Sequence, residues 1–138
     1  MATLTLKPGS MTLAELRRVG RGNDPVALAE GWRKGVELSL VALGQRLAAG
    51  EALYGINTGF GKLAKTRISG DELAKLQLNL VRSHAAGVGA PLADSTVRLI
   101  LVLKAASLAR GFSGVRTIVI ERLLQLVNAG IYPLVPGQ

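Results

Sequence analysis

Apolar residues recur every three or four positions along most of the sequence, and glycine or proline closes each segment in which they do so. A period near 3.6 residues places such side chains on one face of a helix, so the pattern predicts a succession of amphipathic helices. The segment from Thr3 to Leu6 instead suggests a short strand. We therefore expect an all-α fold with at most one short N-terminal strand.

Polar residues mark where the predicted helices begin. Thr12 followed by Glu15, and Ser69 followed by Glu72, have the spacing of a capping box, in which side chain and backbone groups of the two residues satisfy each other. Asp94 stands where its carboxylate can cap a further helix. These signals predict three of the helix starts.

A long helix is predicted between Asp24-Pro25 and Gly50, because aspartate is a good N-cap and proline suits the first helical position. Gly31 and Gly35 lie four positions apart within it, so we expect a neighbouring helix to approach closely on that side. Its apolar face comprises Leu28, Trp32, Val36, Leu40, Leu43 and Leu47.

The helix predicted after Asp94 is apolar around most of its circumference, which is typical of a helix buried in a large assembly. The other predicted helices do not offer enough surface to cover it. We therefore expect further helices, from the rest of a longer polypeptide or from neighbouring subunits, to pack on it. Its apolar residues are Val97, Ile100, Leu101, Leu103, Ala105, Leu108 and Ala109.

The net charge of +8 raises the question of nucleic-acid binding. The cations are spread along the chain, with one dense group at Arg17, Arg18 and Arg21, and only two Phe, two Tyr and one Trp are available for base stacking. Nucleic-acid binding is therefore disfavoured.

The absence of cysteine excludes a disulfide framework and a thiolate zinc site, and it fits a reducing compartment. The N-terminus lacks the pattern of a secretory signal, and the apolar run Leu99–Leu103 is far shorter than the roughly 20 residues that span a bilayer. We expect a soluble, cytoplasmic protein that does not contact a membrane.

The stretch LYGINTGFGK places Gly55, Gly59 and Gly61 beside Tyr54 in one loop. Glycines permit positive φ angles and close approach of the backbone to another group, and Asn57 favours turns. The spacing matches neither the dinucleotide-binding fingerprint nor the P-loop, so phosphate binding is the weakest interpretation. A structural turn and a site loop that presents Tyr54 both stay open.

His84 is the single histidine of the sequence. It continues the apolar face of Leu73, Leu76 and Leu80, which points it inward, either as a core histidine or as a ligand-binding group. A metal site is disfavoured, because one histidine without cysteine or an acidic cluster lacks the usual ligand set. Ser83 is expected to project roughly 100° away on the helix, so the two are not a nucleophile and its base.

Four stretches, LYGINTGFGK, LQLNLVRSHAAGVGAPL, VRLILVLKAASLARGFSGVR and IYPLVPGQ, together resemble the N-terminal part of the histidine-type aromatic amino-acid lyases. The resemblance runs from LTLKPGSMTLAELRRV to Gln138, and between Gly20 and Gly50 it rests on helical character more than on motif. It implies the aspartase-like multi-helix fold of that family, assembled as a homotetramer whose active sites draw residues from several subunits. Residues 1–110 are then an N-terminal helical domain that carries the tyrosine loop, and residues 111–138 begin a central helical domain.

The resemblance also implies a reaction, the removal of ammonia from L-histidine to give urocanate. The electrophile is methylidene-imidazolone (MIO), which these lyases make from their own Ala-Ser-Gly. Tyr54 is the implied general acid or base. Because a free phenol titrates at about 10, a basic role at neutral pH needs cationic neighbours that stabilise the phenolate. The candidates in sequence are Lys62, Lys65 and Arg67.

Ser83 and His84 are similar to the position that sets substrate selectivity in the family, where tyrosine-type and phenylalanine-type relatives carry His-Leu and Phe-Leu. An imidazole at this position can exchange a hydrogen bond with the imidazole of a histidine substrate, whereas an apolar pair favours a phenyl ring. Phe60 and Gly61 are expected to line the same substrate site.

The sequence contains no Ala-Ser-Gly. We therefore expect this chain alone to be inactive, and the MIO group to come from polypeptide beyond Gln138 or from a separate chain that carries the C-terminal portion. The alternatives are a segment of a phenylalanine or tyrosine ammonia-lyase, a segment of an aminomutase, or a non-catalytic helical module. No metal is expected in any of them.

Overall fold

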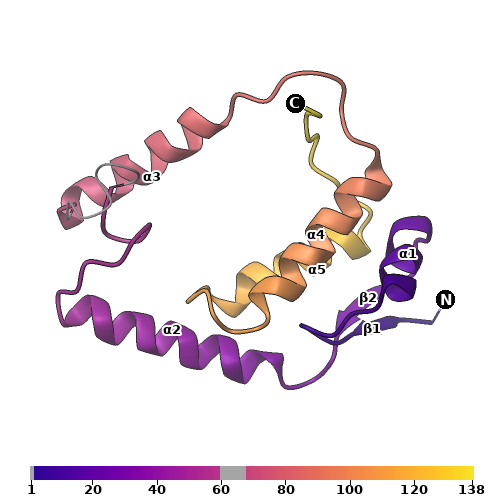
Figure 1. Cartoon of the computed structure of the whole chain (residues 1–138), viewed down its shortest axis with the longest axis horizontal. Coiled ribbons are helices and arrows are strands. Elements are labelled where there is room, and N and C mark those ends of the chain that lie inside the picture. The colour runs from indigo at the N-terminus through magenta and orange to yellow at the C-terminus, as the bar shows by residue number, and fades with distance from the viewer. Residues whose placement is uncertain (1, 60–67) are drawn as a thin grey trace.

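The computed structural model describes residues 2–59 and 68–138. Their elements follow in the order β1 (Leu4–Leu6), α1 (Leu13–Arg21), β2 (Val26–Leu28), α2 (Trp32–Ala48), α3 (Gly70–His84), α4 (Asp94–Leu108) and α5 (Thr117–Asn128). The expected all-α class is confirmed, since helices dominate and the two short strands form one small sheet (Figure 1).

The strand β2 occupies residues for which the sequence predicts the first turn of a helix, so that prediction is wrong. β2 pairs in parallel with β1. The Asn128 side chain binds the other edge, accepting from the Val26 N–H at 2.8 Å and donating to the Val26 carbonyl at 2.9 Å. Because these contacts satisfy the strand's backbone, the start signal at Asp24-Pro25 is overridden. α2 begins only after Gly31, which is its N-cap in the left-handed region and not an interior residue.

The predicted capping boxes differ in outcome. At α1, the Thr12 hydroxyl accepts from the Glu15 N–H at 3.2 Å, and the Glu15 carboxylate accepts from the Thr12 N–H at 2.7 Å, which completes the box. At α3, Ser69 is the N-cap, but its hydroxyl bonds the Glu72 carboxylate and not the backbone. The second box is therefore not formed, although the helix begins where it was predicted to begin.

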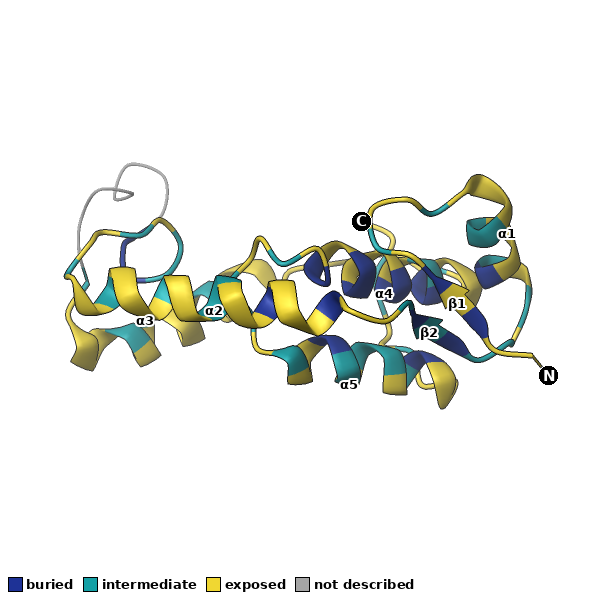
Figure 2. Cartoon of the chain, turned by 90° about the horizontal axis from the view of Figure 1, so that it is seen from below, coloured by how far each residue is buried: buried dark blue, intermediate teal, exposed yellow. Residues whose placement is uncertain are grey.

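The core is built around α4. Val102 and Ala105 of this helix are fully buried, with Ile120 of α5 and Val19 of α1 packed around them (Figure 2). The helix begins one position away from the prediction, since Ala93 is its N-cap and Asp94 its first residue. α4 and α5 pack along each other across the predicted domain boundary after residue 110, which stays a prediction.

Apolar side chains remain exposed on all four longer helices. Beyond its first turns, which contribute Trp32 and Val36 to the core, α2 forms an arm with α3, and most of the surface of these two helices is exposed in Figure 2. α4 itself is uncovered on one side, so the described part of the chain does not bury it almost completely. The exposed residues include Leu38 and Val41 of α2, Leu78 and Val81 of α3, Ile100 and Leu103 of α4, and Ile118 and Val119 of α5.

Of the close approach predicted beside Gly31 and Gly35, only the part at Gly35 occurs, and its partner is the turn that follows α4 and not a helix; nothing lies within 4 Å of a Cβ placed on Gly31. A Cβ on Gly111 would lie 2.6 Å from the carbonyl carbon of Gly35, and Gly111 has a φ of 79°. Two residues past Phe112, the N–H of Gly114 donates to the Ser39 hydroxyl of α2 at 3.0 Å. The turn is thus seated against α2, which positions the groove described below.

Candidate functional site

Tyr54 lies in a tight turn after α2. The Leu53 carbonyl accepts a hydrogen bond of 3.0 Å from the Ile56 N–H, which closes the turn. Gly55 has a φ of 74°, a left-handed value that glycine adopts without strain and that turns of this kind require at their third position. The Tyr54 side chain is 65% exposed. Gly55, the first glycine of the motif, therefore allows the chain to turn directly after Tyr54.

Asn57 fixes this turn from its buried side. Its side-chain oxygen accepts from the Leu53 N–H at 2.7 Å, and its amide nitrogen donates to the Glu51 carbonyl at 2.8 Å. The neighbouring Thr58 is fully buried. The two interpretations of the glycine motif are compatible, because the loop is a hydrogen-bonded structural turn that also presents the Tyr54 side chain outward.

Tyr54 lines a groove of about 410 Å³ between α2 and the turn after α4. Phe112, at the tip of that turn, is 80% exposed, and the Arg110 guanidinium lies 5.5 Å from its ring centroid. An aromatic ligand could stack on such a ring. The groove is lined by Ser39, Ala42, Leu43, Arg46, Leu53, Tyr54, Ile56, Phe112, Ser113 and Gly114.

Phe112 is a candidate site residue that the sequence reasoning missed. The glycines on either side of it were interpreted only as the end of a helix. An aromatic residue between Gly111 and Gly114 was the available signal, since a large apolar side chain in a glycine turn is held out of the core.

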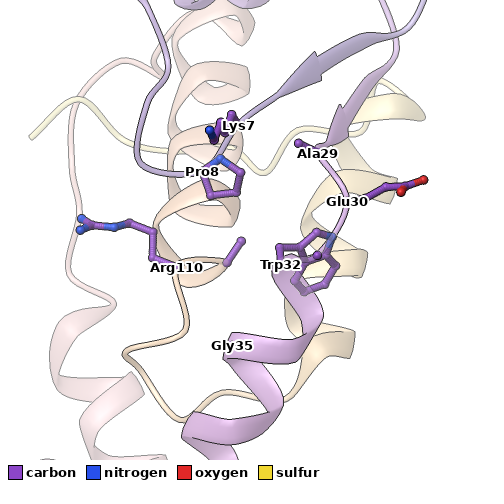
Figure 3. Close-up of a pocket in the computed structure, with 9 residues that line it drawn as sticks. Lys7, Pro8, Ala29, Glu30, Trp32, Gly35 and Arg110 are labelled. Carbon is purple, nitrogen blue, oxygen red and sulfur yellow. The ribbon is translucent and has the colours of Figure 1, made fainter.

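A second hollow, of about 320 Å³, lies where the ends of β1 and β2 meet the start of α2 and the end of α4. Figure 3 shows the Arg110 and Glu30 side chains extending in opposite directions, away from Trp32 and Pro8. Polar groups do not converge in this hollow, so it is a weaker candidate than the Tyr54 groove.

His84 is exposed, and α3 has no buried residue, so the prediction that this side chain points inward is wrong. The predicted apolar face of Leu73, Leu76 and Leu80 is only partly covered. The periodicity is correct, but the described part of the chain covers that face only in part. Among the described residues, His84 is therefore not a core histidine.

Ser83 and His84 approach more closely than predicted, with 3.1 Å between Ser83 Oγ and His84 Nδ1. Both groups also bond the Leu80 carbonyl, at 3.0 Å from Oγ and 2.8 Å from Nδ1. Because a carbonyl only accepts, the short contact with Leu80 favours the tautomer in which Nδ1 carries the proton, and in that tautomer Nδ1 is not a base for the serine. In the neutral ring, Nε2 is then the nitrogen able to accept a hydrogen bond from a ligand.

The predicted site residues are only partly brought together. Tyr54 lies in the turn after α2, whereas Ser83 and His84 are the last two residues of α3. His84 and Ser83 do not line the Tyr54 groove. Phe60 and Gly61, like Lys62, Lys65 and Arg67, lie outside the described residues.

The C-terminal segment runs antiparallel to the loop that follows His84. The Val88 N–H donates to the Gln138 carbonyl at 2.8 Å, and the Gln138 N–H donates back to Val88 at 3.0 Å. A Cβ on Gly87 would lie 2.8 Å from Pro136 Cγ. Gly87 lies beyond the end of α3, and its lack of a side chain permits this contact. Residue 138 therefore lies close to the loop that follows α3.

Among the described residues, no group of three or more His, Asp or Glu side chains could hold a metal ion. Within the same part of the chain, no helix combines the length and the apolar character needed to cross a membrane.

A model of the family described as aromatic amino acid lyase matches residues 11–138. Over all 138 residues, the chain is 52% identical to histidine ammonia-lyases from Salmonella heidelberg and Salmonella dublin. It spans 27% of the length of each of these relatives.

Solved structures with a similar fold include both lyases and aminomutases. Tyrosine aminomutase from Streptomyces globisporus has a TM-score of 0.88 at 31% identity, over 98% of this chain and 26% of that chain. Histidine ammonia-lyase from Trypanosoma cruzi has a TM-score of 0.85 at 31% identity, over 99% of this chain and 26% of that chain. The backbone alone therefore does not separate the two reactions.

Proposed function

The chain belongs to the aromatic amino acid lyase family, and we propose that it supplies two parts of an active site that removes ammonia from L-histidine to give urocanate. The observation that carries this proposal is the 52% identity to histidine ammonia-lyases over the whole chain, which includes the Tyr54 turn and the Ser83-His84 pair. The whole reaction is assigned to a longer or assembled protein, because the chain spans 27% of those relatives.

The MIO group of this family supplies the electrophile in the reaction. It is built from consecutive Ala, Ser and Gly residues, and the 138 residues contain no such tripeptide. The residues present therefore do not fit the group, and the roles below concern only the side chains of this chain. We expect no lyase activity from the chain by itself.

The proposed role of Tyr54 is proton transfer at its hydroxyl. The exposed side chain, the frame provided by Asn57 and the adjoining groove support this role, because an acid or base must reach the substrate while its backbone is held. Phe112 and, outside the described residues, Phe60 and Gly61 are proposed to line the substrate site with it.

The proposed role of His84 is recognition of the substrate imidazole. Its Nδ1 is occupied by the Leu80 carbonyl, so Nε2 is available to accept a hydrogen bond from the ring N–H of histidine. Tyr54 lies in the turn after α2, whereas His84 is the last residue of α3, and we propose that a homotetramer, in the cytoplasm, completes the pocket around them.

An aminomutase is the second candidate, since such an enzyme has the same fold at 31% identity. The higher identity to histidine ammonia-lyases favours the lyase. Turnover of histidine, phenylalanine and tyrosine, with product analysis for urocanate against β-amino acids, separates these possibilities.

The experiment is a fusion of residues 1–138 to the remaining part of the Salmonella heidelberg histidine ammonia-lyase. We expect the purified fusion to convert histidine to urocanate, measured by ultraviolet absorbance, and the chain alone to be inactive. A correctly assembled fusion that prefers phenylalanine or tyrosine, or that yields β-amino acids, would reject the proposed function.

A further inference from the structure

Arg98 is a buried cation, 4% exposed, whose partners within the described part of the chain are all neutral oxygens. Its Nε donates to the Val19 carbonyl at 2.9 Å, and one terminal nitrogen donates to the Val127 carbonyl at 3.0 Å and to the Tyr132 hydroxyl at 3.1 Å. The other terminal nitrogen donates to the Asp24 carbonyl at 2.5 Å.

The position of this cation explains how it is stabilised without a carboxylate. Val19 is in the last turn of α1 and Val127 is in the last turn of α5. The carbonyls at a helix C-terminus lack intrahelical partners and carry partial negative charge, so a guanidinium that caps two such ends is well placed. Arg98 thereby joins α1, α4 and α5 at one point.

Tyr132 is the contact of Arg98 that leads out of this junction. It lies in the segment that connects α5 to the C-terminal residues, and it packs against the core. From there the backbone pairs with the loop after α3, where the Leu92 N–H donates to Val135 at 2.8 Å and the Gly137 N–H donates to Ala90 at 3.0 Å. Val135 and Leu92 also pack against the core, and the Tyr132 hydroxyl adds a hydrogen-bonded side-chain link between the buried junction and the paired C-terminal segment.

We propose that Arg98 is a positioning residue that, by holding Tyr132, keeps residues 135–138 in register against residues 88–92. This register sets where the polypeptide at Gln138 lies relative to His84 at the end of α3. The effect on catalysis rests on the proposed function, whereas the effect on register does not.

The test is the Tyr132→Phe substitution in the 138-residue chain, followed by amide hydrogen exchange measured by NMR. The variant retains the three bonds of Arg98 to backbone carbonyls, so the junction is expected to fold. We expect exchange at Val88, Leu92, Gly137 and Gln138 to accelerate about tenfold, because a hydrogen bond to a charged group is lost. The amides of Val102 and Ala105 in α4 are expected to keep their protection.

The matched control is Tyr54→Phe, since the sequence has only two tyrosines and Tyr54 is outside this junction. It removes the same kind of hydroxyl, and it is expected to leave the exchange rates of the Val88, Leu92, Gly137 and Gln138 amides unchanged. Equal acceleration in α4, or no acceleration at the four amides in Tyr132→Phe, would overturn the positioning role.

A second measurement addresses catalysis in the fusion described above. Tyr132→Phe is expected to lower kcat for histidine about tenfold, because the polypeptide at Gln138 is displaced relative to the bound substrate. KM is expected to stay unchanged, because His84, which binds the substrate imidazole, keeps its place on α3. An unchanged kcat would overturn the catalytic part of the inference. If the parent fusion were inactive, the proposed function would fail, and the exchange measurement would still decide the register.

Discussion

The backbone at Tyr54 is positioned by hydrogen bonds of the neighbouring Asn57 side chain. The Tyr54 side chain is 65% exposed, whereas Asn57 is 6% exposed and bonds two backbone groups, the Leu53 N–H and the Glu51 carbonyl, that lead into the turn. A buried amide with two backbone partners resists displacement, since breaking these bonds leaves polar groups without partners. The backbone at Tyr54 is therefore held in a defined place while its side chain stays accessible.

Replacing Asn57 with Ala is expected to lower the free energy of unfolding by about 1–3 kcal/mol, because the Leu53 N–H and Glu51 carbonyl lose their partner. Denaturant unfolding followed by circular dichroism measures the change. The matched control is Asn79→Ala on the exposed surface of α3, for which we expect a change within about 0.5 kcal/mol. Equal effects of the two substitutions would contradict the role given to Asn57.

At the scale of elements, local patterns predicted the helices and distant contacts determined the exceptions. The helices α3 and α4 were predictable because helical spacing is a property of residues close together in the sequence. β2 was not, since its partners are β1 and the Asn128 side chain, which is 102 positions away from Val26. The Tyr54 turn could likewise be predicted, whereas the exposure of His84 depends on which elements cover α3.

The capping box at α1 gives a pH-dependent prediction. Hydrogen bonds from the Thr12 backbone and hydroxyl hold the pKa of Glu15 below its ordinary value of 4.5. A carboxyl with a lowered folded-state pKa stabilises the fold above its unfolded pKa and loses that effect as pH falls through the folded value. The difference in Tm between the chain and its Glu15→Gln variant should therefore be present at neutral pH and vanish in acid. A difference in Tm that stays constant from neutral to acidic pH would contradict a capping box stabilised by the ionised Glu15 carboxylate.

The close contact between Gly111, in the turn after α4, and Gly35 of α2 can be tested by comparing two substitutions. Gly111→Ala is expected to destabilise the chain by at least about 2 kcal/mol, because φ is positive and the new Cβ would meet the Gly35 backbone at 2.6 Å. Gly44→Ala is expected to stabilise it by about 0.5–1 kcal/mol, since this helical glycine has open space beside it. Denaturant unfolding compares the two, and a tolerated Gly111→Ala would contradict the close contact.

The whole molecule has one compact core and an extended arm. The core gathers α1, α4, α5, the sheet and the first part of α2, while the rest of α2 and α3 extend away with apolar residues uncovered (Figures 1 and 2). Apolar surface of this extent is typical of faces that pack on another protein surface. This architecture agrees with an active site that is completed by polypeptide other than these 138 residues.

Steady-state histidine turnover by the fusion protein, with Tyr54→Phe and His84→Ala compared against the parent, tests the central claim most directly. The claim is that Tyr54 transfers a proton to or from the substrate, whereas His84 at the end of α3 binds the imidazole of the same substrate. We predict that Tyr54→Phe lowers kcat by about 10²-fold or more, and that His84→Ala mainly raises KM for histidine, by about tenfold. Parent-like kcat and KM in both variants would contradict the claim.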